Sequence, residues 1–213
     1  MLTIGVVAIQ GAVSEHLTAL KKSSKDLDCN IVTIKRKGIV PHCDGLIIPG
    51  GESTTISRIL RFEGIDKEIL ANKEIPIMGT CAGLIIMSNY KNKYVEGLKL
   101  IDMQVKRNAF GRQAESFELP LTVTVFNSPF DGIFIRAPAI TQVGSATDLL
   151  ARVDKYGVAA QQGNKLALAF HPELGNDLRF HEYFLRLLDN EEPPNWQPRV
   201  HKIRREGAIS MNR

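Results

Sequence analysis

Cys81 lies where an apolar strand pattern meets an apolar helix pattern, within Gly79-Thr80-Cys81-Ala82-Gly83. Glycines two residues to either side allow a close strand–helix approach, and a nucleophile in such a turn stands clear of the backbone. A helix beginning at Ala82 would point its N-terminus at the sulfur, favouring the thiolate and supplying N–H donors for an oxyanion. The pattern predicts a nucleophile, and the alternative is a buried structural cysteine.

A cysteine nucleophile needs a base and a group that orients the base, and His171-Pro172-Glu173 could provide both. The triplet follows the apolar run 165–170, so it lies at the carboxyl end of an expected strand, where sites form in α/β sheets. Residues i and i+2 of an extended segment share a side, so Glu173 could hold one ring nitrogen of His171 while the other faces Cys81. Alone, the triplet is weak evidence and its alternative is a structural turn, but together with the Cys81 motif it predicts a base and its orienter.

The other histidines have weaker patterns. His16 and His181 fall in helical patterns and are interpreted as ordinary surface or packing residues. His42 lies in a connection beside Pro41, and His201 lies near the C-terminus.

A third segment, Pro49-Gly50-Gly51-Glu52-Ser53-Thr54-Thr55, also follows an expected strand. Its two glycines could expose backbone N–H groups to a ligand, and Ser53 or Thr54 suits the N-cap of a following helix. The segment lacks the lysine of a phosphate-binding P-loop. The sequence leaves open a ligand-binding loop or a simple capped turn.

The elements that would position these residues alternate between strand and helix in the first half of the chain. Apolar runs predict strands at 3–9, 30–35, 45–49 and 75–80, and helical spacing predicts helices at 13–25, 54–72 and 82–90. Such alternation indicates parallel strands joined by crossover helices.

The second half is richer in strand patterns. We expect strands at 121–126, 132–136, 156–161 and 165–170, a hairpin turn at 162–164 and a final helix at 177–188. The prediction is a single α/β domain over residues 1–190, with a mixed, mostly parallel sheet flanked by helices. Residues 191–213, which are proline-rich and then basic, are predicted to be a partly disordered C-terminal extension.

Composition excludes several classes of protein. The net charge of +4 arises in 199–213, and the preceding residues are neutral overall, so no basic face for nucleic acid is expected. No apolar run is long enough to span a membrane, and the N-terminus does not resemble a signal peptide, so we expect a cytoplasmic protein. Three cysteines, at 29, 43 and 81, form neither a disulfide framework nor a zinc motif.

Taken together, these motifs resemble the class I, or triad, glutamine amidotransferases. The similarity is closer to one family, the glutaminase subunits of pyridoxal 5′-phosphate synthase. The further stretches that carry it are Ile4-Gly5-Val6, Gln10-Gly11-Ala12 with Glu15-His16, Asp44-Gly45-Leu46, Leu84-Ile85, Arg107-Asn108, Phe110-Gly111-Arg112-Gln113, Ser116-Phe117-Glu118, Phe134-Ile135-Arg136-Ala137-Pro138 and Phe170. They occur in the family's order from residue 1 to about residue 190.

The resemblance implies a role for each matching position. Cys81 would be the nucleophile, His171 the base and Glu173 its orienter. The residues implied to line the glutamine pocket or hold its polar groups are Gly51, Glu52, Ser53, Arg107, Ile135 and Arg136. The backbone N–H groups of Gly51 and Ala82 would form the oxyanion hole. An arginine suits the α-carboxylate of glutamine, and Arg112 is a weaker candidate.

The resemblance also implies a reaction and a partner. L-Glutamine would be hydrolysed through a thioester, without metal or organic cofactor, and the ammonia would pass to a pyridoxal 5′-phosphate synthase subunit in a multimeric complex. One alternative is an amidotransferase serving purine, histidine or tryptophan biosynthesis. The other is a catalytically silent binding module, against which the intact set of thiol, imidazole and carboxylate argues.

Overall fold

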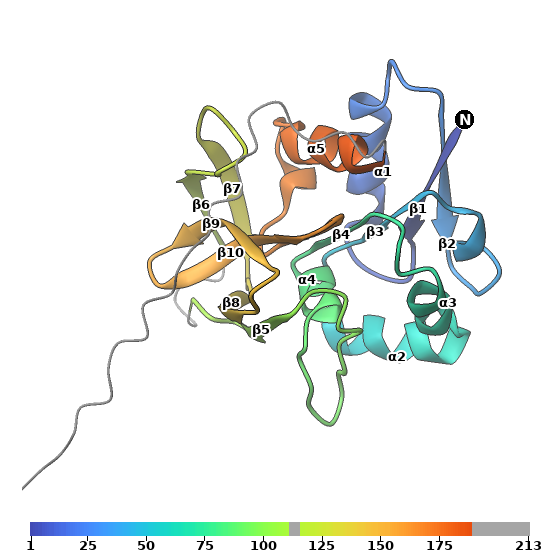
Figure 1. The fold of residues 1–213 in the computed structure, drawn as a ribbon, viewed down its shortest axis with the longest axis horizontal. Coiled ribbons are helices and arrows are strands. Elements are labelled where there is room, and N and C mark those ends of the chain that lie inside the picture. The colour runs from blue at the N-terminus through green and yellow to red at the C-terminus, as the bar shows by residue number, and fades with distance from the viewer. Residues whose placement is uncertain (111–115, 189–213) are drawn as a thin grey trace, which may run out of the picture.

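A nine-stranded sheet forms the centre of the computed structural model, which describes residues 1–110 and 116–188. Its strand order is β2-β1-β3-β4-β11-β10-β8-β5, with β9 paired to β10 (Figure 1). The strands of this sheet are β1 (Leu2–Val7), β2 (Cys29–Ile34), β3 (Gly45–Ile48), β4 (Ile77–Thr80), β5 (Met103–Lys106), β8 (Ala139–Val143), β9 (Asp148–Val153), β10 (Tyr156–Gln162) and β11 (Lys165–Leu168). Strands β6 (Ser116–Leu121) and β7 (Phe130–Ile135) form a separate antiparallel pair.

Helices cover both faces of the sheet's first half. They are α1 (Val13–Ser23), α2 (Ser53–Glu63), α3 (Ile65–Ala71), α4 (Ala82–Met87) and α5 (Arg179–Leu188), with short 3-10 turns η1 (Val40–His42) and η2 (Pro172–Leu174). Figure 1 shows α1 and α5 side by side on one face, with α2, α3 and α4 on the other.

The strands β2, β1, β3, β4 and β11 run parallel, and antiparallel pairing begins at β10. Every residue of β3, β4 and β11 is buried, as expected for central strands covered on both faces. This explains why their sequences are mostly small and apolar residues without polar alternation, although Lys165 at the start of β11 is buried as well. The expected mixed α/β fold is confirmed.

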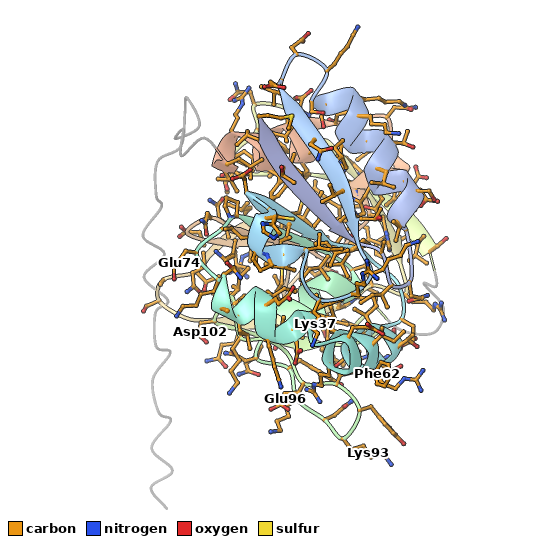
Figure 2. All side chains as sticks on the ribbon, turned by 90° about the vertical axis from the view of Figure 1, so that its right-hand side faces the viewer. Lys37, Phe62, Glu74, Lys93, Glu96 and Asp102 are labelled. Carbon is orange, nitrogen blue, oxygen red and sulfur yellow. The ribbon has the colours of Figure 1, made fainter. Side chains whose placement is uncertain are left out.

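Side chains fill the space between the sheet and its helices, while charged side chains such as those of Lys93 and Glu96 lie at the periphery (Figure 2). The largest wholly buried side chains include five phenylalanines, at 130, 134, 170, 180 and 184. All five come from β7, the segment after β11, and α5. They therefore pack the segment that carries His171 between the small β6–β7 sheet and the last helix.

Two predictions in the first half need correction. The helix expected over 54–72 is two helices, because Gly64 adopts a left-handed conformation with φ of 71° and ends α2. The N-cap of α2 is Glu52, whose carboxylate accepts the N–H of Thr54 at 3.3 Å, rather than Ser53 or Thr54. Ser53 is instead the first helical residue, and it is buried.

The second half departs further from the prediction. The strand expected at 121–126 is wrong for most of its length, because β6 ends at Leu121. Strands β5, β8 and β9 were not predicted. The expected hairpin is present: Gln162 pairs with Lys165 across a two-residue turn. Arg112 and the extension 191–213 lie outside the described residues.

Replacing Gly64 with alanine is expected to lower the free energy of unfolding by about 1 kcal/mol. An added methyl group would meet no close neighbour, since only Cδ of Lys37 lies near it, at 3.8 Å. The cost is therefore the left-handed backbone alone, and Gly64→Asn should cost less because asparagine tolerates that conformation. Denaturant unfolding of the three proteins measures this, and identical midpoints for all three would contradict it.

Candidate active site

Three neighbouring strands end at one edge of the sheet, and each continues into one of the motifs singled out above. Strand β4 lies between β3 and β11, with Thr80 opposite Leu168 and Gly79 opposite Ile48. The residues that follow are Gly50-Gly51 after β3, Cys81 after β4 and His171 after β11. Parallel strands place their carboxyl ends together, so residues far apart in sequence meet here.

Cys81 occupies a strained turn with φ of 49° and ψ of −101°. Its N–H donates to the carbonyl of Leu168 at 2.7 Å, which ties the turn to β11. A methyl group on Gly79 would crowd Met87 and Gly83, and one on Gly83 would overlap the carbonyl oxygen of Ile48. Both glycines of the motif are therefore required by the close approach of α4 to the sheet.

His171 and Glu173 form a buried pair. Nδ1 of His171 lies 2.7 Å from Oε1 of Glu173, and the Glu173 side chain is fully buried. The N–H of His171 donates to the carbonyl of Ile133 in β7 at 2.8 Å, which fixes the backbone of the motif. The orienting contact expected from the i, i+2 spacing is present, although η2 begins at Pro172 and the segment is not fully extended.

The surroundings of His171 favour its charged form. Burial lowers its pKa, but hydrogen bonds to Cys81 and Glu173, together with the charges of both groups, outweigh burial and raise the pKa to about 10. The imidazole therefore holds a proton at neutral pH.

Gly50 packs directly against His171 and Cys81. A methyl group on it would overlap Cε1 of His171 and lie 3.1 Å from Cβ of Cys81. The Gly50 N–H donates to Oγ1 of Thr80 at 3.0 Å, and its carbonyl accepts the N–H of Ala12 at 3.1 Å. Bonds on both sides thereby hold the loop after β3 against the turn that contains Cys81.

An open pocket of about 230 Å³ lies in front of Cys81. All six residues expected to hold the substrate line it, as do Cys81, Ala82 and His171. Those six are Gly51, Glu52, Ser53, Arg107, Ile135 and Arg136. Glu173 is absent from the lining because it lies behind His171.

Charged and polar groups are unevenly placed around the pocket. Arg107 Nη2 pairs with Glu52 Oε1 at 3.0 Å, and both side chains are partly exposed. Ser53 Oγ is buried and has no hydrogen-bond partner among the described residues. Arg136 has a positive φ of 43°, so its backbone is strained where β7 ends. Cys81 Sγ makes a weak contact with the carbonyl of Ile135, at 3.8 Å.

Sequence reasoning gave no role to four lining residues, namely Gln10, Ile85, Asn108 and Pro138. Gln10 is the most connected, since its Oε1 accepts the N–H of Glu52 at 2.7 Å. It follows β1, so the rule that ligands bind at the carboxyl ends of parallel strands could have identified it. Asn108, with a positive φ of 47°, shows no comparable signal in the sequence.

His16 and His181, interpreted from the sequence as ordinary surface or packing residues, are not on the surface: both are fully buried, in a polar chain behind His171 and Glu173. His16 Nδ1 lies 3.1 Å from His181 Nε2, and His16 Nε2 lies 3.1 Å from Thr80 Oγ1 and 3.4 Å from Glu173 Oε2. Burial lowers the pKa of His181 to about 4. Burial, followed by the charges of His181 and His171, holds the pKa of His16 well below its ordinary value.

Within residues 1–110 and 116–188, no group of three or more histidine, cysteine, aspartate or glutamate residues is arranged to bind a metal ion. No helix in these ranges is long and apolar enough to cross a bilayer.

This arrangement is suited to acyl transfer through a cysteine, on an α/β sheet with its pocket at the carboxyl edge of the parallel strands. It places the chain in the class of glutamine amidotransferases. A solved structure described as a glutamine amidotransferase has the same fold, with a TM-score of 0.78 and 40% identity, covering 87% of this chain and 98% of that one.

The chain belongs to the SNO glutamine amidotransferase family, whose family model matches residues 6–190. A relative from Methanosarcina mazei named pyridoxal 5′-phosphate synthase subunit PdxT is 53% identical over 193 residues, covering 86% of this chain and 97% of the relative. Another of that name, from Methanococcoides burtonii, is 52% identical over 198 residues, covering 89% of this chain and 100% of the relative. The resemblance inferred from the motifs is confirmed.

Gly50→Ala is expected to lower glutaminase kcat/KM by about 100-fold or more, because its methyl group displaces the imidazole of His171 and small misplacements of reacting groups are costly. Gly163→Ala is the steric control, since a methyl group there meets nothing within 4 Å, although Gly163, unlike Gly50, has a left-handed backbone with φ of 56°. Kinetic and unfolding measurements on both variants distinguish a loss of catalysis from a loss of stability. Equal kcat/KM for the two variants would contradict the role given to Gly50.

Stability is expected to fall in mild acid because His181 is buried and neutral. The unfolded chain binds this proton below about pH 6.5 and the folded chain only below about pH 4, so the contribution is complete above pH 6.5 and is lost towards pH 4. It amounts to about 3 kcal/mol. The raised pKa of His171 makes stability depend on pH only between pH 6.5 and about 10, so it does not affect the change in stability between pH 6.5 and pH 4.

The measurement is the free energy of unfolding at pH 7 and pH 4.5 for the wild type and for His181→Gln, which does not titrate there. The wild type should lose more stability than the variant. Parallel pH dependences would show that His181 is not held neutral.

Proposed function

We propose that the chain is the glutaminase subunit of a pyridoxal 5′-phosphate synthase and hydrolyses L-glutamine with Cys81, His171 and Glu173. Membership of a glutamine amidotransferase family gives the reaction class. The observation that carries the residue assignment is the position of His171, which lines the same pocket as Cys81 while its Nδ1 lies 2.7 Å from the buried carboxylate of Glu173.

In the proposed reaction, the Cys81 thiolate attacks the side-chain amide carbon of glutamine. The C–N bond then breaks as His171 gives its proton to the leaving nitrogen, which departs as ammonia, and a γ-glutamyl thioester remains. Water gives a proton to His171 and attacks the thioester, releasing glutamate and restoring the thiolate. Glu173 keeps the imidazole oriented and stabilises its charged form throughout.

The oxyanion of each tetrahedral intermediate would be bound by the backbone N–H groups of Gly51 and Ala82. Ala82 is the first residue of α4, and both residues line the pocket. Removing one such donor costs roughly 10²–10³ in rate.

Glutamine is a zwitterion with an amide side chain, and the pocket offers groups for each part. Arg107 and Arg136 would hold the α-carboxylate and other polar groups, while Glu52, already paired with Arg107, offers a carboxylate for the α-ammonium. Ser53 Oγ is available to the substrate because no described residue bonds to it. Ile135 would contribute backbone and apolar contact.

The names of the relatives support pyridoxal 5′-phosphate synthesis over purine, histidine or tryptophan synthesis as the destination of the ammonia. The partner would be the synthase subunit, assembled with this chain in a multimeric complex. We assign the glutaminase domain to residues 1–190, where the family match also ends, and treat 191–213 as an extension outside it.

Cys81→Ala is expected to abolish glutamine hydrolysis while leaving the fold intact. The glutamine mimic diazo-oxo-norleucine should label Cys81 in preference to Cys29 and Cys43. Cys43 is buried, and burial, followed by the charge of Asp44, raises its pKa to about 11, so it forms little thiolate. Peptide mapping identifies the labelled residue.

Two further variants test the roles of the base and its orienter. His171→Asn should cost several orders of magnitude in kcat and Glu173→Gln less, because only the imidazole moves the proton. Undiminished turnover in Cys81→Ala, or wild-type rates in His171→Asn, would overturn the assignment, and the absence of hydrolysis by any form would favour a silent binding module.

We also expect the isolated chain to hydrolyse glutamine poorly and the synthase subunit to activate it. Ammonia released without an acceptor is wasted, and rotation of the Gly50–Gly51 peptide could add or remove one oxyanion donor, worth roughly 10²–10³ in rate. That rotation would break the bond from Ala12 N–H to the Gly50 carbonyl. The partner would select one orientation by binding it more tightly.

The measurement is steady-state glutaminase activity at saturating glutamine, with and without the synthase subunit. Full activity of the chain alone, unchanged by the partner, would rule out the switch and leave the hydrolase assignment standing.

A further inference from the structure

A buried chain of polar side chains continues behind the catalytic pair. It runs from His181 in α5 through His16 in α1 to Thr80 at the end of β4 and to Glu173 in η2. Figure 1 shows α1 and α5 side by side on the same face of the sheet. Both histidines have no exposed surface, so their ring nitrogens can bond only to other groups of the protein.

The contacts define the tautomer of His16. Its Nε2 faces two oxygens, Thr80 Oγ1 at 3.1 Å and Glu173 Oε2 at 3.4 Å. A bare lone pair on Nε2 would repel the carboxylate, so Nε2 carries the proton, which bonds to Thr80 Oγ1 and lies close to Glu173 Oε2. The 3.4 Å separation is a close electrostatic contact rather than an aligned hydrogen bond, and Glu173 Oε2 has no better donor among the described residues.

The second histidine completes the arrangement. With a proton on Nε2, neutral His16 has an acceptor at Nδ1, which takes the Nε2–H of His181 at 3.1 Å. His181 Nδ1 is then a lone pair, in agreement with its having no hydrogen-bond partner in the part of the chain that the structure describes. His181 therefore fixes the orientation of the His16 ring.

We propose that His16 is a positioning residue for glutamine hydrolysis, whose Nε2–H holds the second oxygen of Glu173 so that the carboxylate stays fixed beside His171. The proposal rests on the triad roles assigned above. His16 acts through Glu173 and contacts neither the pocket nor the substrate.

A neutral His16 suits this role better than a charged one. Its N–H dipole stabilises the carboxylate without neutralising it, whereas an imidazolium would compete with His171 for the same negative charge. The charged or titratable groups that face His16 are His181 from α5 and His171 and Glu173 from the segment around η2. Burial and the two histidines disfavour a second cation there.

The same ring also touches the loop that contains Gly50. Thr80 Oγ1, which His16 contacts, accepts the N–H of Gly50 at 3.0 Å. Loss of the His16 N–H would therefore loosen the hydroxyl that anchors Gly50 as well as the carboxylate that orients His171.

Two substitutions of His16 separate the contacts made by its Nε2 from the contact made by its Nδ1. In His16→Gln the side-chain amide nitrogen reaches the place of Nε2 and retains a donor towards Thr80 and Glu173. In His16→Asn the shorter amide reaches only the place of Nδ1, so it retains the contact with His181 and loses the other two. Both are polar and smaller than histidine, which makes them a matched pair for stability.

The experiment measures kcat/KM for glutamine against pH, with the synthase subunit present, for the wild type and both variants. For His16→Asn we expect kcat/KM at pH 8 to fall about tenfold. We also expect the alkaline limb, the decline of kcat/KM at high pH, to begin about one pH unit lower than in the wild type. The limb moves because a less firmly held Glu173 stabilises the His171 cation less. For His16→Gln we expect kcat/KM within about threefold of wild type, with the limb in place.

A merely structural role predicts a different pattern. Equal kcat/KM and equal alkaline limbs for His16→Asn and His16→Gln would overturn the proposal, as would a fall in His16→Asn with the limb unmoved. Unfolding midpoints of the three proteins show whether the loss follows stability. Failure of the triad assignment itself is distinguishable, because Cys81→Ala would then retain activity.

Discussion

The bond between His171 Nδ1 and Glu173 Oε1, 2.7 Å long and shielded from solvent, determines how the rest of the site works. A buried carboxylate must be stabilised by donors or by positive charge, and here it is stabilised by an imidazole that in turn faces a thiol. Three histidines are buried in the same region, and their protonation differs for this reason. The pKa of His171 is raised to about 10, whereas burial lowers that of His181 to about 4.

This charge distribution depends on the order of strands in the sheet. Cys81 and His171 follow β4 and β11, which are adjacent and parallel, and Gly50 follows β3 on the other side of β4. The approach is so close that side chains are excluded at Gly50, Gly79 and Gly83. Helices α1 and α5 close the opposite side and bring His16 and His181 to the back of Glu173. The fold thus places Cys81 at an open pocket and buries the Glu173 carboxylate away from solvent.

Much of this could be predicted from the sequence because the decisive signals are local. The glycines around Cys81 and the two-residue separation of His171 and Glu173 are readable without any knowledge of distant contacts. The continuous apolar runs of β3, β4 and β11 likewise identify central strands.

What could not be predicted depends on contacts between distant segments. His16 looks like an ordinary helical residue, because its partners lie 64 to 165 positions away in the sequence. Glu52 caps α2 with its own carboxylate, a function for which Ser53 and Thr54 are the stronger statistical candidates. Strands β5, β8 and β9 pair with partners that the local pattern does not specify, and Gly64 ends a helix whose apolar spacing continues beyond it.

The account depends most directly on the charge of His171 in the folded protein. Nitrogen-15 NMR of histidine-labelled protein, with signals assigned by His→Gln substitution, reports the protonation of each ring nitrogen. The account predicts that at pH 8 both ring nitrogens of His171 carry protons, while His16 and His181 are neutral and protonated at Nε2. A His171 ring that loses its proton near pH 6.5, as a solvent-exposed histidine does, would contradict it.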